Sequence, residues 1–92
     1  MSYRLQASEA VVKQLNRLPK PVRVRLWEKI RALPSAPRPA GTKALGGALK
    51  PLRSLRVGDY RAIYAVDDEA GAIRVTHVGH RSRVYTDAER GV

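Results

Sequence analysis

The segment LRSLRVGDYRAIYAVDDEAGAIRVTHV, residues 52–78, decides the fold. It contains three apolar runs, at Leu52–Val57, Tyr60–Val66 and Ala72–Val78, in which hydrophobic and polar side chains tend to alternate. Such alternation is typical of strands that bury one face. Gly58-Asp59 and the run DDEAG separate the three runs, and both have the composition of tight turns. The segment therefore predicts a three-stranded antiparallel meander.

The residues before this segment predict one more strand and two helices. Tyr3–Ala7 alternates as a short strand does, and we expect it at an edge of the sheet. Ser8 stands where a helix N-cap would, apolar residues follow at helical spacing, and Pro19 ends the run. Pro21 suits the first turn of a second helix, which Pro34 closes. The short link between the helices predicts an antiparallel helix hairpin.

Together these elements predict one α+β domain over residues 1–92. The helix hairpin should cover one face of a twisted, mainly antiparallel sheet of about four strands, and the N-terminal strand should belong to that sheet. A loop is expected over residues 34–42, followed by a short strand around Ala44 and Leu45. The polar tail TDAERGV, residues 86–92, is expected to fray.

Composition indicates a globular protein of a reducing compartment. Hydrophobic residues make up 43% of the chain, which is enough for a modest core, and there is no cysteine for a disulfide or a thiolate metal site. No segment approaches the roughly 18 consecutive apolar residues of a membrane span, and the N-terminus has no apolar signal core. We therefore expect a cytoplasmic protein without a membrane association.

The net charge indicates a negatively charged partner. Eighteen Lys and Arg residues against eight Asp and Glu residues give a formal charge of +10, and thirteen of the eighteen are arginines. The planar guanidinium group presents a fork of donors that matches phosphate oxygens and can stack on bases. Nucleic acid, an acidic protein, or both are the expected partners.

The run VGHRSRVY, residues 78–85, collects basic groups at the end of the third meander strand. Strand alternation brings Arg56, Arg61 and Arg81 to the side of the sheet opposite the helices. A bulge near Gly58 would change this register. The face that Arg81 continues is expected to hold four residues of the last strand, Ile73, Val75, His77 and Gly79.

Converging arginines beside a tyrosine suit metal-independent cleavage of RNA. In this reaction the 2′-hydroxyl attacks the adjacent phosphate, and negative charge gathers on the phosphoryl oxygens. Arginines aimed at those oxygens stabilise the transition state selectively. A base removes the proton of the 2′-hydroxyl and an acid supplies one to the 5′-oxygen, while stacking on Tyr85 holds the nucleotide in line.

Several of these residues also have a plain structural interpretation. Arg56 suits a solvated strand position, and Arg61 could form an ion pair with Asp59. His77 fits a packing role within its strand. The acidic run at residues 67–69 has no partners at metal-ligand spacing, and a hairpin turn explains it. In contrast, Arg81 lies so close to Arg83 in sequence that their repulsion favours a bound anion.

The order of elements and two motifs resemble the RelE/ParE superfamily of toxins from toxin–antitoxin systems, and the RelE branch in particular. The motifs are LRVGDYRAIYAVDDE and VGHRSRVY, and the helix pair with its loop, LPKPVRVRLWEKIRAL followed by PRPAGTKALGG, also fits. The resemblance covers residues 3 to about 85. It implies a ribosome-dependent endoribonuclease that cleaves mRNA, inhibits translation and uses no cofactor.

The resemblance assigns catalytic residues only in part. Arg61, in DYR, and Arg81, in GHR, match the family's arginines, and Tyr85 matches the tyrosine that closes the second motif. RelE toxins carry two lysines on the strand before the DYR turn, and the matching positions here are Ser54 and Arg56.

This departure changes the expected chemistry. Arg56 can hold a phosphate, but arginine keeps its proton and is a poor base. His80 lies inside the second motif, and histidine is the residue type best suited to proton transfer near neutral pH, so we expect His80 to act as base or acid. Arg53, Ser54 and Arg83 are expected to contact RNA.

The resemblance also implies partners and leaves two alternatives open. The partners are an acidic, RelB-like antitoxin, the ribosome and mRNA, with operator DNA bound only through the antitoxin complex. The first alternative is a ParE-type inhibitor of DNA gyrase without nuclease activity, which the missing lysines allow. The second is an inactive module that binds its antitoxin and regulates. The GHR…VY ending favours the RelE reading.

Overall fold

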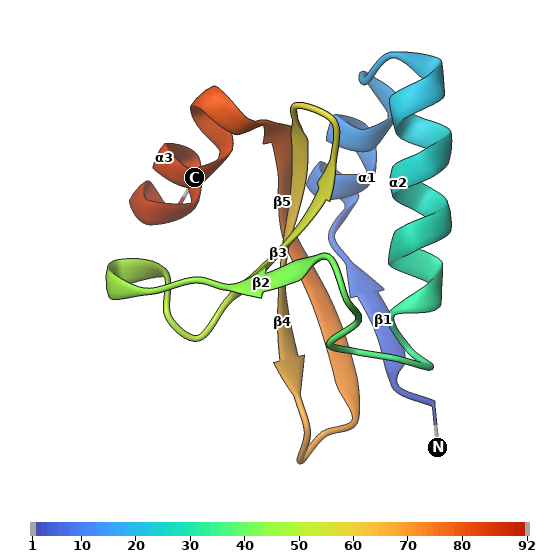
Figure 1. Cartoon of the computed structure of the whole chain (residues 1–92), viewed down its shortest axis with the longest axis vertical. Coiled ribbons are helices and arrows are strands. Elements are labelled where there is room, and N and C mark those ends of the chain that lie inside the picture. Colours follow the sequence, from blue (N-terminus) through green and yellow to red (C-terminus); the bar gives the residue numbers. More distant parts are fainter. Residues whose placement is uncertain (1, 92) are drawn as a thin grey trace.

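The computed structural model describes residues 2–91 and contains one mixed sheet. Figure 1 shows its strands, which follow one another in space as β1-β5-β4-β3-β2. Strands β3, β4 and β5 are consecutive antiparallel neighbours, so the predicted meander is confirmed. The bounds of the strands are β1 (Arg4–Ala7), β2 (Thr42–Ala44), β3 (Arg53–Val57), β4 (Tyr60–Asp67) and β5 (Ala72–His80).

Strand β1 lies at one edge of the sheet, as predicted, and pairs in parallel with β5. Strand β2 forms the other edge and pairs with β3. The sheet therefore has five strands where about four were expected, because the short β2 completes it. The α+β class and the mainly antiparallel sheet are confirmed.

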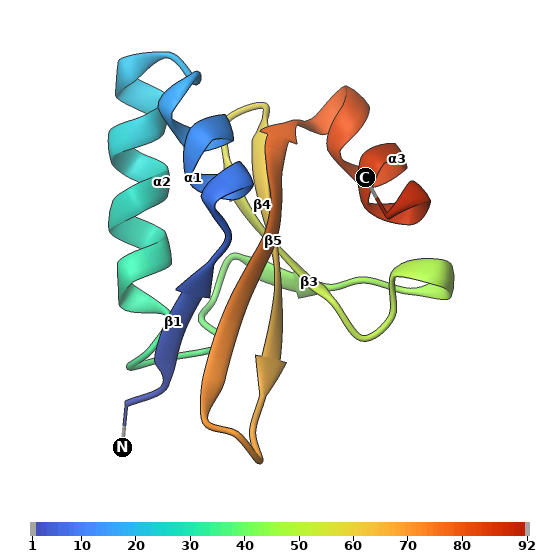
Figure 2. The ribbon, with the colours of Figure 1, turned by 180° about the vertical axis from the view of Figure 1, so that it is seen from behind.

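Two helices, α1 (Glu9–Asn16) and α2 (Lys20–Ala32), cover one face of the sheet, as predicted (Figures 1 and 2). The hydroxyl of Ser8 caps α1 by accepting a hydrogen bond of 3.2 Å from the backbone N–H of Val11. Pro21 lies in the first turn of α2, where the N–H that proline lacks has no intrahelical partner.

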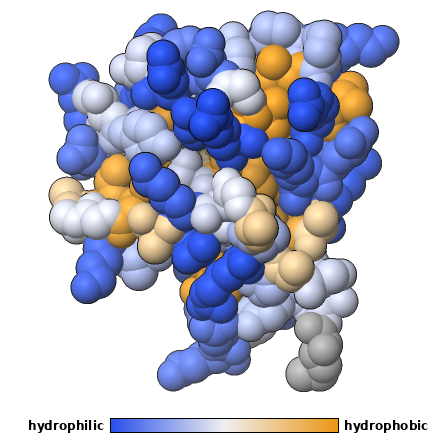
Figure 3. All heavy atoms as spheres, viewed as in Figure 1, coloured by the Kyte–Doolittle hydropathy of each residue, from blue (hydrophilic) through white to orange (hydrophobic). Residues whose placement is uncertain are grey.

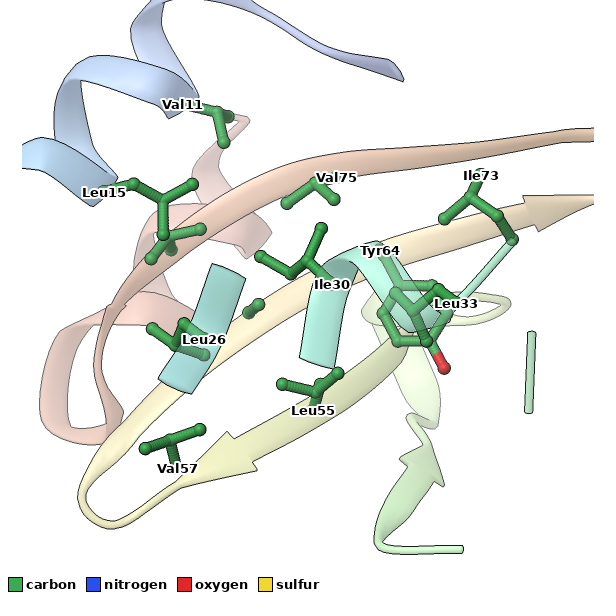
Figure 4. Close-up of a cluster of buried hydrophobic side chains, with 12 residues drawn as sticks. Val11, Leu15, Leu26, Ile30, Leu33, Leu55, Val57, Tyr64, Ile73 and Val75 are labelled. Atoms are coloured by element: carbon green, nitrogen blue, oxygen red, sulfur yellow. The ribbon is translucent and has the colours of Figure 1, made fainter. Parts of the chain in front are cut away.

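The hydrophobic core lies between this helix pair and the sheet. Figure 4 shows Leu26 and Ile30 of α2 directed towards Val57 and Leu55 of β3. Leu26 and Ile30 are almost completely buried, at 0% and 1% exposure. Outside the core, the face seen in Figure 3 is covered mainly by hydrophilic side chains. Among residues 2–91 no helix is long and apolar enough to cross a membrane.

A third helix, α3 (Arg81–Arg90), is present where the sequence predicted a frayed tail over residues 86–92. That prediction was wrong for residues 86–90, and residue 92 of the predicted tail lies outside the described residues. In Figures 1 and 2, α3 lies on the face opposite α1 and α2. Val84 is its one buried residue and packs against Gly79 of β5. Gly91 ends the helix in the left-handed region, with φ of 71°. One apolar anchor on an otherwise polar segment gave little sequence signal.

A register shift in the β4–β5 ladder corrects the predicted faces of β5. Ile63 pairs with His77, but its neighbour Tyr64 pairs with Val75, so Thr76 is an extra residue on β5. Ile73 and Val75 consequently face the core, whereas His77 and Gly79 align with the opposite face. The four residues do not share one face, because the bulge lies at Thr76 and not near Gly58.

A cluster of three side chains, the half-buried Tyr3 and the exposed Arg38 and Asp68, links the start of β1 to the far end of the meander. The hydroxyl of Tyr3 donates to Asp68 at 2.6 Å, and Arg38 donates to the same carboxylate at 2.9 Å. The hydrogen bond from Arg38 holds the pKa of Asp68 below its usual range, and Tyr3 acts in the same direction. The hydrogen bond to Asp68 raises the pKa of Tyr3. The cluster ties residue 3, the loop after α2 and the β4–β5 turn together.

We expect the Asp68→Asn variant to be less stable than the unmodified protein at neutral pH and equally stable in acid. A carboxyl whose folded pKa is depressed stabilises the fold above its unfolded value of about 3.9, and this contribution is lost as pH falls through the folded pKa. Urea unfolding at pH 7 and pH 2.5 measures the difference. An equal difference at both pH values would show that the charge of Asp68 contributes nothing.

Candidate active site

A pocket of about 680 Å³ opens between α3 and the sheet face that α1 and α2 leave free. Its walls come from β2 and the residues around it, from β3 and β4, and from the first turns of α3. The lining residues are Gly41, Lys43, Leu45, Ser54, Arg56, Arg61, Arg81, Ser82 and Tyr85.

Sheet register places three of these residues on the floor of the pocket. Arg56 of β3 pairs directly with Arg61 of β4, so both side chains leave the sheet on the same face. Ser54 lies two positions before Arg56 and shares that face. The predicted convergence of Arg56 and Arg61 is confirmed by this register.

The third arginine reaches the pocket from the beginning of α3. The N–H of Arg81 donates to the carbonyl of Asp59 at 2.8 Å, which fixes the start of the helix beside the β3–β4 turn. Tyr85 follows four residues later, and side chains at this spacing lie on the same face of a helix. A single helix face therefore presents both Arg81 and Tyr85 to the pocket.

The hydroxyl groups of Tyr85 and Ser54 form a hydrogen bond of 3.0 Å that joins α3 to β3. Ser54 is only 4% exposed, so this contact holds the tyrosine ring in a fixed position over the floor. The bond explains why a small hydroxyl residue stands at position 54. A longer side chain there would displace the tyrosine.

The pocket carries an excess of positive charge. Four of its nine lining residues are lysine or arginine, and none of the nine is acidic. Arg61 donates to the carbonyls of Gly58 and Tyr60, at 2.8 and 2.9 Å, and not to Asp59 as the plain interpretation suggested. The carboxylate of Asp59 instead lies 3.6 Å from Nε of Arg81. Four cationic residues that line one pocket favour an anion with several oxygens, such as a phosphate.

Three residues predicted at the site lie outside this pocket. His80 and Arg83 line a separate groove between α1 and α3. Arg53 pairs with Tyr64 on the core face of the sheet and donates to the hydroxyl of Thr42 at 3.0 Å. Alternation along β3 and along the β5–α3 junction directs these side chains away from Arg56 and Arg81.

His80 has a structural role that its sequence context did not reveal. Its Nδ1 accepts a hydrogen bond of 3.1 Å from the N–H of Ser82 and so caps α3. Its ring packs edge-on against Tyr60, with 5.4 Å between the ring centroids. We therefore revise the expectation that His80 carries a proton: it is the N-cap of α3.

We expect His80→Ala to lower the free energy of unfolding by about 0.5–2 kcal/mol, because α3 loses its cap. If the pocket cleaves mRNA, as the family resemblance implies, the cleavage rate and its pH profile should stay unchanged in this variant. His80→Asp keeps an acceptor at the N-cap and should restore most of the stability. If the pH–rate profile of His80→Ala lost a limb near neutrality, His80 would carry a proton in the reaction.

Lys43 is the one charged lining residue of this pocket that the sequence analysis did not name. It lies on β2 directly opposite Ser54 of β3, and so on the pocket face. Strand β2 has three residues between glycine-containing segments, and such a short edge strand has no periodicity to assign its faces. Among residues 2–91, no three His, Cys, Asp or Glu side chains gather as metal ligands do.

Comparison with known proteins agrees with this fold. Residues 5–85 match the model of the ParE toxin family, from type II toxin–antitoxin systems, and this range contains every pocket residue. The chain belongs to the RelE/ParE superfamily. It is 32% identical over 84 residues to Toxin RelE of Mycobacterium tuberculosis, covering 90% of this chain and 86% of that protein.

Solved structures of RelE proteins share the architecture. A mutant of E. coli toxin RelE in the free state superposes with a TM-score of 0.78 at 28% identity, covering 100% of this chain and 99% of the other. RelE in the RelE–RelB complex of Pyrococcus horikoshii gives 0.76 at 33% identity, covering 91% and 100%. The chain is therefore a toxin of the RelE/ParE fold.

Proposed function

We propose that this toxin is a ribosome-dependent endoribonuclease that cleaves mRNA. The observation that carries the proposal is the convergence of Arg56, Arg61 and Arg81 with Tyr85 in one pocket without acidic residues. A phosphodiester of a single-stranded RNA fits this charge, and a base or sugar fits against the tyrosine ring. The relatives named RelE support the same activity.

The proposed reaction uses these groups in the following way. The 2′-hydroxyl oxygen attacks phosphorus, the bond to the 5′-oxygen breaks, and a 2′,3′-cyclic phosphate and a 5′-hydroxyl result. Arg81 holds the scissile phosphate while Arg56 and Arg61 stabilise the charge that develops on its free oxygens. Tyr85, fixed by Ser54, orients the nucleotide that carries the 2′-hydroxyl. The three guanidinium groups supply the neutralisation that a metal ion supplies in other nucleases.

The partners follow from the charge and from the relatives. Similar toxins are found in RelE–RelB complexes, so we propose an acidic, RelB-like antitoxin that neutralises this chain, with operator DNA bound through that complex. The net charge of +10 suits an acidic partner and also the ribosome. A cytoplasmic location is part of this proposal.

We expect binding to mRNA-programmed ribosomes to weaken steeply as salt rises. Each phosphate neutralised contributes about −0.7 to the slope of log K against log salt for single strands. Arg83, on the exposed side of α3, should contribute one such contact, so Arg83→Ala should flatten the slope by about 0.7. Arg53→Ala should leave it unchanged, because Arg53 is engaged with Thr42. An unchanged slope in Arg83→Ala would show that Arg83 does not contact a phosphate.

Cleavage of a defined mRNA by the purified protein tests the proposed function. The protein should cut mRNA positioned on ribosomes within the decoding site, leave the same mRNA intact in the absence of ribosomes, and produce 2′,3′-cyclic phosphate and 5′-hydroxyl ends. The matching family model carries the name of ParE, which keeps inhibition of DNA gyrase as the second candidate. Intact mRNA together with inhibited supercoiling by purified gyrase would favour that candidate.

A further inference from the structure

The proposed reaction needs a group that gives a proton to the leaving 5′-oxygen, and the pocket holds few side chains able to do so. Arg56, Arg61 and Arg81 bind charge but retain their protons throughout the usable pH range. His80 lies in the other groove and its Nδ1 is occupied by the N–H of Ser82. The remaining pocket groups with a transferable proton are hydroxyls and the ammonium group of Lys43.

Lys43 is positioned for this role by the sheet. Its pairing with Ser54 places it on the pocket face beside the hydroxyl that holds Tyr85. Directly paired residues on adjacent antiparallel strands have Cβ atoms about 4.5–5.5 Å apart. Lys43 therefore lies next to Ser54 on the β2 side of the pocket. Arg81 and Tyr85 lie on the α3 side.

This placement matches the geometry of the reaction. The attacking and leaving oxygens lie roughly in line on opposite sides of phosphorus. If Tyr85 on α3 holds the nucleotide with the 2′-hydroxyl, an in-line arrangement would put the leaving 5′-oxygen on the opposite side of phosphorus, which is the β2 side of the pocket. Lys43 is the lining side chain with an N–H⁺ donor on that side.

We propose that Lys43 is the general acid of the cleavage reaction, an inference that rests on the proposed function. A new bond forms between the 2′-oxygen and phosphorus, and the bond from phosphorus to the 5′-oxygen breaks. The proton of the 2′-hydroxyl passes to solvent water. The protonated Lys43 gives one proton to the 5′-oxygen and becomes a neutral amine. It then regains a proton from water.

The experiment compares two mRNAs on programmed ribosomes in single turnover. One has the natural oxygen at the scissile 5′ position and the other has sulfur there. A thiolate leaves without a proton, so the sulfur substrate needs no acid. Lys43→Ala should slow cleavage of the oxygen substrate by about 10²–10⁴-fold. On the sulfur substrate the same variant should differ from the unmodified protein by less than about tenfold.

Two further variants separate proton transfer from charge and from folding. Lys43→Arg keeps the charge but cannot donate the proton, so it should follow Lys43→Ala on both substrates. Lys20→Ala removes one positive charge from the first turn of α2, outside the pocket, and should cleave both substrates as the unmodified protein does.

The outcomes distinguish this inference from the proposed function. If the unmodified protein leaves both mRNAs intact, the proposed function fails and the role of Lys43 with it. If the unmodified protein cleaves but Lys43→Ala is slowed equally on oxygen and sulfur, Lys43 is not the acid. If the sulfur substrate restored the cleavage rate of Tyr85→Phe but not that of Lys43→Ala, the general acid would be Tyr85.

Discussion

Replacing Arg81 by alanine should lower the rate of mRNA cleavage by on the order of 10³–10⁵-fold while the protein stays folded. A guanidinium aimed at a phosphoryl group in transfer has an effect of this size in other enzymes. The side chain of Arg81 is 62% exposed, and its ion pair with Asp59 spans 3.6 Å. Such surface pairs contribute about 0–1 kcal/mol. The backbone bond from residue 81 to Asp59 is retained by alanine.

The measurement is single-turnover cleavage on programmed ribosomes, with circular dichroism and urea unfolding as the check on folding. Arg81→Lys should recover only part of the rate, because a point charge cannot reproduce a two-pronged contact with phosphate. Arg90→Ala is the matched control, since it removes one arginine from the last turn of the same helix, outside the pocket. Equal rates for Arg81→Ala and Arg90→Ala would contradict the assignment of Arg81.

Replacing Leu26 by alanine should destabilise the fold by about 2–5 kcal/mol. Leu26 is 0% exposed at the interface of α2 with β3, and the deletion removes three buried carbons and leaves a cavity. A domain with an ordinary free energy of unfolding, about 5–15 kcal/mol, would lose a large part of it. Toxicity in cells should fall with the folded population, although the pocket is untouched.

Urea unfolding with an unchanged m-value measures this loss. Val24→Ala provides the control on the same helix, because Val24 is 43% exposed and its truncation should stay within about 0.5 kcal/mol. A change of less than 1 kcal/mol in Leu26→Ala would show that the helix pair does not depend on this contact with the sheet.

The elements with strong local signals could be predicted from the sequence. Proline residues and the Ser8 cap bounded the two helices, and alternation defined the meander. The helix α3 was missed because its stability comes from tertiary contacts, namely the burial of Val84 and the bond from Tyr85 to Ser54. The bulge at Thr76 was missed because an extra residue in a strand leaves no compositional mark.

The site was predictable to the extent that it follows strand register. Arg56 and Arg61 pair across a two-residue turn, which fixes their common face. Lys43 was missed because β2 is a short edge strand, and the partner of Lys43, Ser54, lies eleven residues further along the chain. The N-cap role of His80 was missed because a motif position alone does not tell whether a side chain points into a pocket or caps a helix.

Mapping of mRNA 5′ ends in cells after induction of this toxin tests most directly whether the arginine pocket cleaves mRNA on the ribosome. We predict new 5′ ends inside translated codons within minutes, absent from untranslated transcripts and from cells that express Arg81→Ala. Intact mRNA in growth-arrested cells, accompanied by double-stranded breaks in DNA, would contradict the proposed function and indicate a gyrase inhibitor of the ParE type.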